Sequence, residues 1–195
     1  DRRGIDVALL YRKSSLKFIS GSFHTPSLDG EKLPTRDILH AEMQLSDQRN
    51  IHFIVNHHPS KYGGESQSEG RRKVALSTLK NVCDSIGGKG IVAMGDFNDT
   101  PDASQFKIID DILENKGISL HNDHQGTIRY KGKWDLIDFF LTSRDVSPSE
   151  MYVVRLPFLM VYDKRYPGEK PLRTYSGPRY LGGVSDHCPI LLWID

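Results

Sequence analysis

The sequence has little cysteine, no long apolar run and almost no net charge. Two cysteines in 195 residues exclude a disulfide-rich scaffold and a four-cysteine zinc site. No apolar stretch approaches the roughly 18 residues that a membrane-spanning helix needs. The 26 Lys and Arg against 25 Asp and Glu leave a formal charge of +1, which argues against a strongly basic nucleic-acid coat. An ordinary globular composition remains, with Cys83 and Cys188 open as free or paired.

Hydrophobic periodicity predicts strands interspersed with helices. Strands are expected over residues 5–12, 39–45, 51–55, 90–95, 151–155 and 190–194, the second and third forming a hairpin. Helical spacing over 69–86 predicts a helix that ends at Gly87 and Gly88. This order of elements predicts a mixed α/β or α+β fold.

Turn and cap residues predict the remaining elements. Thr100 and Pro101 are typical of an N-cap followed by the first position of a helix. Residues 127–130 and 136–141 are expected to form a hairpin around a Lys-Gly-Lys turn. The proline- and glycine-containing stretch over 164–183 is expected to be a long loop.

Gly95-Asp96-Phe97-Asn98 follows the apolar strand over 90–95. In an extended chain Asp96 and Asn98 point to the same side, because the side-chain period of a strand is two. A carboxylate and an amide then converge at the strand's C-terminal end. Such a pair can orient a water molecule or hold a phosphate oxygen, with Asp as base and Asn as uncharged donor. The alternative is an Asx turn that links strand to helix.

Asp186 and His187 directly precede the last expected strand. Neighbouring side chains of an extended chain point to opposite sides, so each needs its own partner. A histidine commonly needs a carboxylate to fix its tautomer and orientation. Asp138 is the candidate, because it lies inside an apolar strand where a charge needs a partner. The alternative for Asp138 is a structural carboxylate in a buried network.

Asn56-His57-His58 closes the third strand. A histidine here can donate a proton or hydrogen-bond a phosphate, whereas no second His or Cys cluster with zinc-finger spacing supports a zinc site. Asp6 interrupts the apolar face of the first strand, and it is either an outward-facing acid or the brace of a histidine.

Basic and aromatic residues outside these motifs are candidates for substrate contacts. Lys61, Arg71 and Arg72 flank a segment rich in Gly and Ser, where they could meet phosphate, although a solvated helix start is the simpler interpretation. Arg173 and Tyr175 lie in the expected loop, and loops carry specificity more often than the core.

Four motifs in this order resemble the endonuclease/exonuclease/phosphatase superfamily, which has the DNase I-like fold. They are Asn56-His57, Gly-Asp-Phe-Asn at 95–98, Ile-Asp-Phe-Phe-Leu at 137–141 and Ser-Asp-His at 185–187. The resemblance spans residues 3–193, and the opening segment and residues 126–134 look like a bacterial subgroup. It implies an α/β (α+β) fold, a four-layer α/β/β/α sandwich of two mostly antiparallel sheets, as a single domain over residues 1–195.

The resemblance implies catalytic roles for the matched residues. Asp96 looks like the acid that handles the attacking water or its metal, and Asn98 like the amide that contacts the phosphate. His187 resembles the histidine that faces the scissile phosphate, with Asp138 as its supporting acid. His57 resembles the second active-site histidine, with His58 as the alternative.

The resemblance also implies a metal site. Asp186 looks like a metal-coordinating acid for Mg²⁺ or Mn²⁺, and Asp6 aligns loosely with the acid that braces His57. The family pattern begins with a strand bearing an Asn and then a Glu that is the principal metal ligand. Neither has a counterpart upstream of Asp1, so the expectation is an N-terminally incomplete domain, completed by a missing segment or by a second chain.

The leading hypothesis is therefore a divalent-metal-dependent hydrolase of phosphoesters, favouring phosphodiesters. The superfamily's substrates include nucleic acids, phospholipids and sugar phosphates, and the sequence does not choose among them. The alternative hypothesis is a catalytically silent fragment or binding module on the same fold, because the metal-ligand Glu is absent.

Overall fold

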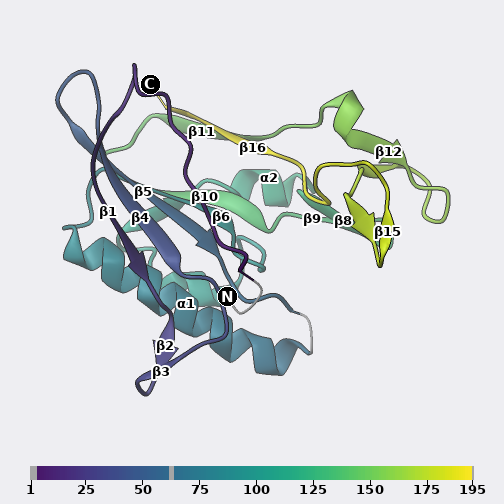
Figure 1. Cartoon of the computed structure of the whole chain (residues 1–195), viewed down its shortest axis with the longest axis horizontal. Helices are drawn as coiled ribbons and strands as arrows, with labels where there is room; N and C mark the ends of the chain where they lie inside the picture. Colours follow the sequence, from purple (N-terminus) through teal and green to yellow (C-terminus); the bar gives the residue numbers. More distant parts are fainter. Residues whose placement is uncertain (1–3, 62–63, 195) are drawn as a thin grey trace.

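A six-stranded sheet forms the centre of the computed structural model, which describes residues 4–61 and 64–194 (Figure 1). In spatial order its strands are β1 (Lys17–His24), β4 (Ile38–Gln44), β5 (Asn50–His57), β6 (Ile91–Asp96), β10 (Asp138–Ser143) and β7 (Leu113–Asn115). Neighbouring strands are antiparallel except β5 and β6, which run parallel. Helix α1 (Glu65–Ser85) supplies the crossover that a parallel pair requires.

Helix α1 runs along the sheet, and its apolar side chains belong to the core (Figure 1). Leu76, Leu79 and Val82 are buried in one cluster with residues of β5 and β6. The helix predicted over 69–86 is confirmed, although it begins one turn earlier. It ends before Gly87 and Gly88, whose φ values of 76° and 67° lie in the left-handed region that favours glycine.

Strands β11 (Ser149–Val153) and β16 (Ile190–Ile194) form a separate antiparallel pair. Met151 of β11 is buried, and Ile190 and Leu192 of β16 pack against the same core. Both strands lie where the sequence predicts them, and the predicted mixed α/β fold is confirmed.

Three short hairpin-like pairs extend beyond the main sheet on one side of the molecule, and we call them the arm (Figure 1). The arm comprises β8 (Ile128–Tyr130) with β9 (Lys133–Asp135), β12 (Met160–Tyr162) with β13 (Glu169–Pro171), and β14 (Tyr175–Ser176) with β15 (Arg179–Tyr180). The remaining elements are β2 (Ser27–Leu28), β3 (Glu31–Lys32), α2 (Ile118–Asn122) and the 3₁₀ helices η1 (Ser104–Ile108) and η2 (Pro157–Leu159).

The strand predicted over residues 5–12 is wrong. Those residues form neither helix nor strand, although Leu9 packs against the core. The edge strand is instead β1, whose side chains are almost all exposed. Because neither face of β1 is covered, the strand lacks the clear alternation that identifies a half-buried strand.

Three other predictions need correction. No α-helix begins at Thr100: its hydroxyl donates to Asp102 Oδ1 at 2.6 Å, and only the 3₁₀ helix η1 follows. The hairpin after residue 127 turns at Lys131 and Gly132, both with positive φ, but its second strand is β9. Residues 138–143 instead enter the main sheet as β10. The expected loop over 164–183 contains β13, β14 and β15.

Both cysteines are free and buried. Among the described residues, no helix combines the length and apolarity needed to cross a bilayer.

Candidate active site

Three adjacent strands bring His57, Asp96 and Asp138 into one row. Asp96 at the end of β6 pairs in register with His57 at the end of β5 and with Asp138 at the start of β10. Residues paired across neighbouring strands project from the same face of a sheet. His57 Nε2 lies 3.4 Å from Asp96 Oδ2, so the row forms a contiguous polar group at one end of an apolar sheet.

Gly95 allows β5 and β6 to approach each other closely beside this row. Its φ is 132°, and a Cβ atom there would lie 2.0 Å from the carbonyl oxygen of Asn56. Any other residue would push the two strands apart just before Asp96, so the motif needs glycine for a steric reason.

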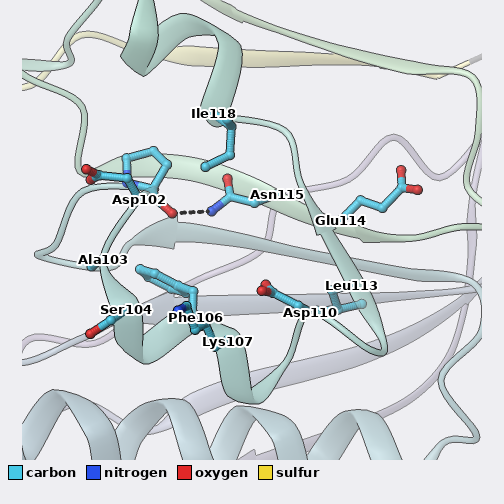
Figure 2. Close-up of a pocket in the computed structure, with 11 residues that line it drawn as sticks. Asp102, Ala103, Ser104, Phe106, Lys107, Asp110, Leu113, Glu114, Asn115 and Ile118 are labelled. Carbon is cyan, nitrogen blue, oxygen red and sulfur yellow. Dashed lines mark hydrogen bonds between the residues drawn. The ribbon is translucent and has the colours of Figure 1, made fainter.

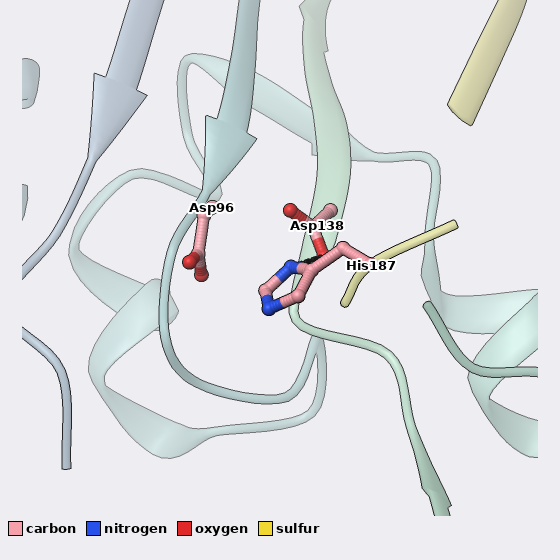
Figure 3. A group of neighbouring side chains, drawn as sticks. All are labelled: Asp96, Asp138 and His187. Carbon is pink, nitrogen blue, oxygen red and sulfur yellow. Dashed lines mark hydrogen bonds and ion pairs between the residues drawn. The ribbon is translucent and has the colours of Figure 1, made fainter. Parts of the chain in front are cut away.

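His187 reaches the row from the segment before β16 (Figure 3). Its backbone forms an isolated β-bridge with Ile128, and its Nδ1 lies 2.8 Å from Asp138 Oδ2. The predicted His187–Asp138 pair is therefore present. A hydrogen bond from Nδ1–H to the carboxylate leaves Nε2 for another partner, and the ring extends toward Asp96 (Figure 3).

Two residues near the row were missed by sequence reasoning. Thr127 is fully buried, and its hydroxyl donates to Asp138 Oδ2 at 2.5 Å. Arg36, in the loop before β4, lies close enough to favour the ionised form of Asp96. Neither residue lies in one of the four family motifs. Although Thr127 opens an expected strand, nothing in the sequence marks it or Arg36 as a neighbour of the row.

The surroundings of the row raise the pKa values of both Asp96 and His187. Burial and the nearby charge of Asp138 raise the pKa of Asp96 to about 7, against the opposing charge of His187. Burial by itself would lower the pKa of His187. The hydrogen bond to Asp138 and the surrounding carboxylates outweigh burial and raise that pKa to about 9.

Asn98 adopts the Asx-turn alternative. Its backbone N–H donates to Asp96 Oδ1 at 2.8 Å, and its φ of 53° rules out the extended chain assumed for the same-side argument. Its side-chain amide donates to the carbonyl oxygen of His58 at 2.9 Å. Asn98 thus lies beside Asp96 because of this turn, and not because both belong to one extended strand.

Two expected acids lie outside the row. Asp186 Oδ2 accepts from Arg173 at 2.6 Å, and both side chains are about half exposed. The carboxylate that faces His57 is Asp96, whereas Asp6 is exposed in the irregular segment before β1.

The other expected substrate contacts are dispersed. Lys61 pairs with Asp99 at 3.1 Å, Arg71 is half-buried on α1, and Tyr175 packs on Tyr180 in the arm. Arg72 is only 1% exposed and pairs with Asp99, so neither interpretation given for it, phosphate contact or solvated helix start, is correct.

A cavity of about 390 Å³ between η1, β7 and α2 contains none of the site residues (Figure 2). Asn115 Nδ2 crosses it and donates to the carbonyl oxygen of Pro101 at 3.1 Å. The cavity is therefore not part of the candidate site.

Asp96, Asp138 and His187 are the described residues whose ligand atoms cluster closely enough to hold a metal ion, within 4.8 Å of one another. Burial, and after it the charge of Asp138, raises the pKa of Asp96 and so disfavours its ionised form. A divalent cation would favour the ionised form, and hard cations prefer carboxylate oxygens. The donor set therefore fits a divalent cation.

His58, directly beneath the row, should make the fold sensitive to acid. It is 2% exposed and packs edge-on against Phe97, with a centroid distance of 5.0 Å. Burial, with the charges of His57 and Arg72, lowers its pKa to about 3. The unfolded chain binds a proton near pH 6.5, so the stability that is complete above pH 6.5 decreases as the pH falls toward 3.

The buried His58 should make the free energy of unfolding about 2 kcal/mol lower at pH 5 than at pH 8. Denaturant titrations of the wild type and His58→Leu at both pH values measure the difference. The variant should lose about 2 kcal/mol less than the wild type between pH 8 and pH 5, and equal losses would contradict the assignment.

Comparison with solved structures identifies the fold. An endonuclease/exonuclease/phosphatase family protein from Bacteroides thetaiotaomicron is 13% identical, with a TM-score of 0.60 (covering 92% of this chain and 65% of that one). The human nocturnin catalytic domain with a bound sulfate anion is 16% identical, with a TM-score of 0.54 (93% and 61%). A mutant beta toxin from Staphylococcus aureus with bound magnesium ions is 17% identical, with a TM-score of 0.51 (80% and 57%).

The chain thus spans 57% to 65% of the length of these three chains. At these identities the likeness concerns the fold, which is DNase I-like as predicted. A comparison with curated proteins gave no match. Residues 1–195 match the family described as "Endonuclease/Exonuclease/phosphatase family", and the chain belongs to this family.

Proposed function

We propose that this protein is a divalent-cation-dependent phosphodiesterase that hydrolyses its substrate by attack of water on phosphorus. Family membership supports a phosphoester hydrolase of the nuclease or phosphatase kind. The observation that carries the finer proposal is the partly buried row of His57, Asp96 and Asp138, joined by His187.

Asp96 acts as the general base in this proposal. A carboxylate with a pKa of about 7 is half ionised at neutral pH and is a much stronger base than an ordinary aspartate. It takes a proton from the attacking water as the new O–P bond forms and the bond from phosphorus to the leaving oxygen breaks. The Asn98 backbone N–H, 2.8 Å from Asp96 Oδ1, holds the carboxylate in place.

In this proposal His187 is protonated, and it stabilises the phosphoryl group. With a pKa of about 9 it carries a positive charge at neutral pH, and Asp138 fixes its Nδ1. Nε2–H can then donate to a phosphoryl oxygen where negative charge accumulates in the transition state. Thr127, bonded to the same oxygen of Asp138, positions this pair.

His57 and Asn98 complete the proposed phosphate site. The His57 ring is about one-third exposed beside Asp96, so it can donate to a second phosphoryl oxygen. The Asn98 amide has one N–H on the His58 carbonyl, which leaves the other available to a substrate oxygen. The sulfate bound to nocturnin, a tetrahedral anion like phosphate, supports anion binding on this fold.

The cation in this proposal is Mg²⁺ or Mn²⁺. Asp186 would hold it by exchanging Arg173 for the cation, and Asp96 would stay free to act as the base. When bound, the cation neutralises charge on the phosphate and on the leaving oxygen. The magnesium ions in beta toxin support this choice.

Hydrolysis of bis(p-nitrophenyl) phosphate and of p-nitrophenyl phosphate tests the proposal. The diester should be cleaved in the presence of Mg²⁺ or Mn²⁺. Activity should fall at least ~100-fold in EDTA and return when the cation is added back. Hydrolysis that is unaffected by EDTA, or that is confined to the monoester, would contradict it.

A binding module without catalysis is the second candidate. The ion pair between Arg173 and Asp186 favours a binding module, because Asp186 is the expected metal ligand. This candidate predicts that sulfate or phosphate raises the melting temperature while neither ester is hydrolysed at any cation concentration.

A further inference from the structure

A second cavity, of about 520 Å³, lies in the arm beside the candidate active site. It is formed by β8 and its turn, by the segment between β12 and β13, and by Arg173 and Asp186. We call it the arm pocket. Its lining contains five basic side chains and two acidic ones, so it carries an excess of three positive charges on a protein whose net charge is +1.

The arm pocket and the row share a wall. Ile128 lines the pocket and forms the isolated β-bridge with His187. Asp186 lines the pocket too, and it immediately precedes His187 in the chain. Bridged backbones lie about 5 Å apart. The arm pocket and His187 are therefore neighbours across this bridge.

Three of the five basic side chains hold the walls together. Arg129 donates to the carbonyl oxygens of Tyr166 and Pro167, both at 3.0 Å. Lys170 pairs with Asp163 at 2.9 Å, and Arg173 pairs with Asp186 at 2.6 Å. These contacts link β8 to the segment between β12 and β13, and Arg173 to the segment before His187.

The three uncompensated charges lie on Arg129, whose partners are neutral carbonyl oxygens, and on the other two basic side chains, Lys131 and Arg165. Lys131 and Arg165 are exposed, and among the described residues neither forms an ion pair with an acid. Lys131 lies over the ring of Tyr130 at 5.2 Å, and Arg165 over that of Tyr166 at 5.6 Å. Such contacts leave N–H groups available to an anion, and phosphate is an anion that Arg and Lys bind through charge-assisted hydrogen bonds.

We propose that the arm pocket binds a second phosphate group of the substrate, one that is not cleaved. The inference rests on the proposed function, since it assumes that the scissile phosphate lies at His187. The preferred substrate then carries two phosphates close together. Either a nucleic-acid strand or a small molecule with several phosphates has this chemistry.

Matched substrate pairs test the proposal. One pair is a thymidine dinucleotide without and with an extra terminal phosphate, at the 5′ or the 3′ end. The other is glycerophosphoinositol without and with a phosphate on its ring. The extra phosphate should raise kcat/KM about tenfold in at least one pair, mostly by lowering KM. A tenfold gain is the effect expected of one charge-assisted hydrogen bond. The pair with the gain identifies the source of the phosphate.

The double variant Lys131→Ala/Arg165→Ala should abolish this gain while leaving kcat/KM for the singly phosphorylated member of each pair within about twofold of the wild type. The double variant Lys89→Ala/Lys107→Ala removes the same charge from exposed residues outside the pocket and should keep the gain. The proposal would be overturned if the extra phosphate gave no gain in the wild type. It would also be overturned if the Lys131→Ala/Arg165→Ala variant lost kcat/KM equally for both members of a pair.

Calorimetric binding of the same compounds in EDTA separates this inference from the proposed function. The extra phosphate should tighten binding about tenfold in the wild type but not in the arm-pocket variant. Such tightening without hydrolysis would uphold the pocket and contradict the phosphodiesterase. Hydrolysis without a phosphate-dependent gain in binding would uphold the phosphodiesterase and contradict the role of the pocket.

Discussion

Asp96→Asn is expected to lower kcat for a phosphodiester about 10³-fold, the range that a general base contributes. The amide keeps the size of the side chain but cannot accept the proton of the attacking water. The same substitution should stabilise the fold. Because the pKa of Asp96 is raised from 3.8 to about 7, the ionised carboxylate lowers stability as the pH rises through 7. In EDTA at pH 8 the variant should gain about 2–4 kcal/mol.

Opposite effects on activity and stability distinguish a catalytic carboxylate from a structural one. Steady-state kinetics and denaturant unfolding at pH 8 measure the two quantities. Asp123→Asn, at an exposed position after α2, is the matched control and should change neither. A kcat for Asp96→Asn within about threefold of the wild type would remove Asp96 from the mechanism.

Arg72→Met is expected to lower the free energy of unfolding by about 3 kcal/mol, the lower end of the cost of breaking a buried ion pair. Asp99 loses its buried partner and keeps the more exposed Lys61. Arg72 donates to Asp99 at 3.2 Å and to Ser68 Oγ at 2.9 Å, and it is almost fully buried. Asp99 is 8% exposed and also accepts from Gln105. This network anchors the loop after Asp96 on α1, so catalysis should decrease as well.

Lys73→Met on the same helix is the control. The exposed Lys73–Glu69 pair should contribute less than about 1 kcal/mol. Thermal unfolding should show a decrease of about 10 °C for Arg72→Met and almost none for Lys73→Met. Equal melting temperatures would mean that the buried pair does not hold the loop.

The sequence predicts the elements that a repeating pattern defines. Helix α1 and the strands β4 and β5 follow from apolar periodicity, because each has one face in the core. Strand β6 follows from a short apolar run, since its first three residues are all buried. The edge strand β1 does not, since its side chains are almost all exposed and show no contrast between faces. The helix expected after Thr100 fails because local hydrogen bonds at Thr100 compete with the first helical turn.

The site divides in the same way. His57, Asp96, Asp138 and His187 lie in motifs, so the resemblance identifies them, and the structure brings them together. The contacts of Thr127, Arg36 and Arg173 depend on which segments meet in three dimensions, and no local pattern records this. Asp186 illustrates the difference: its motif suggests a metal ligand, whereas its nearest cation is the Arg173 side chain.

The register of β5, β6 and β10 affects how this protein can diverge. Inserting or deleting one residue within β6 would turn Asp96 toward the opposite face of the sheet, because side chains alternate along a strand. The row therefore tolerates almost no change in length. The arm pocket lies outside the main sheet, in turns and short hairpins that accept insertions readily. Relatives could thus acquire new substrates by remodelling the arm while they keep the same reaction.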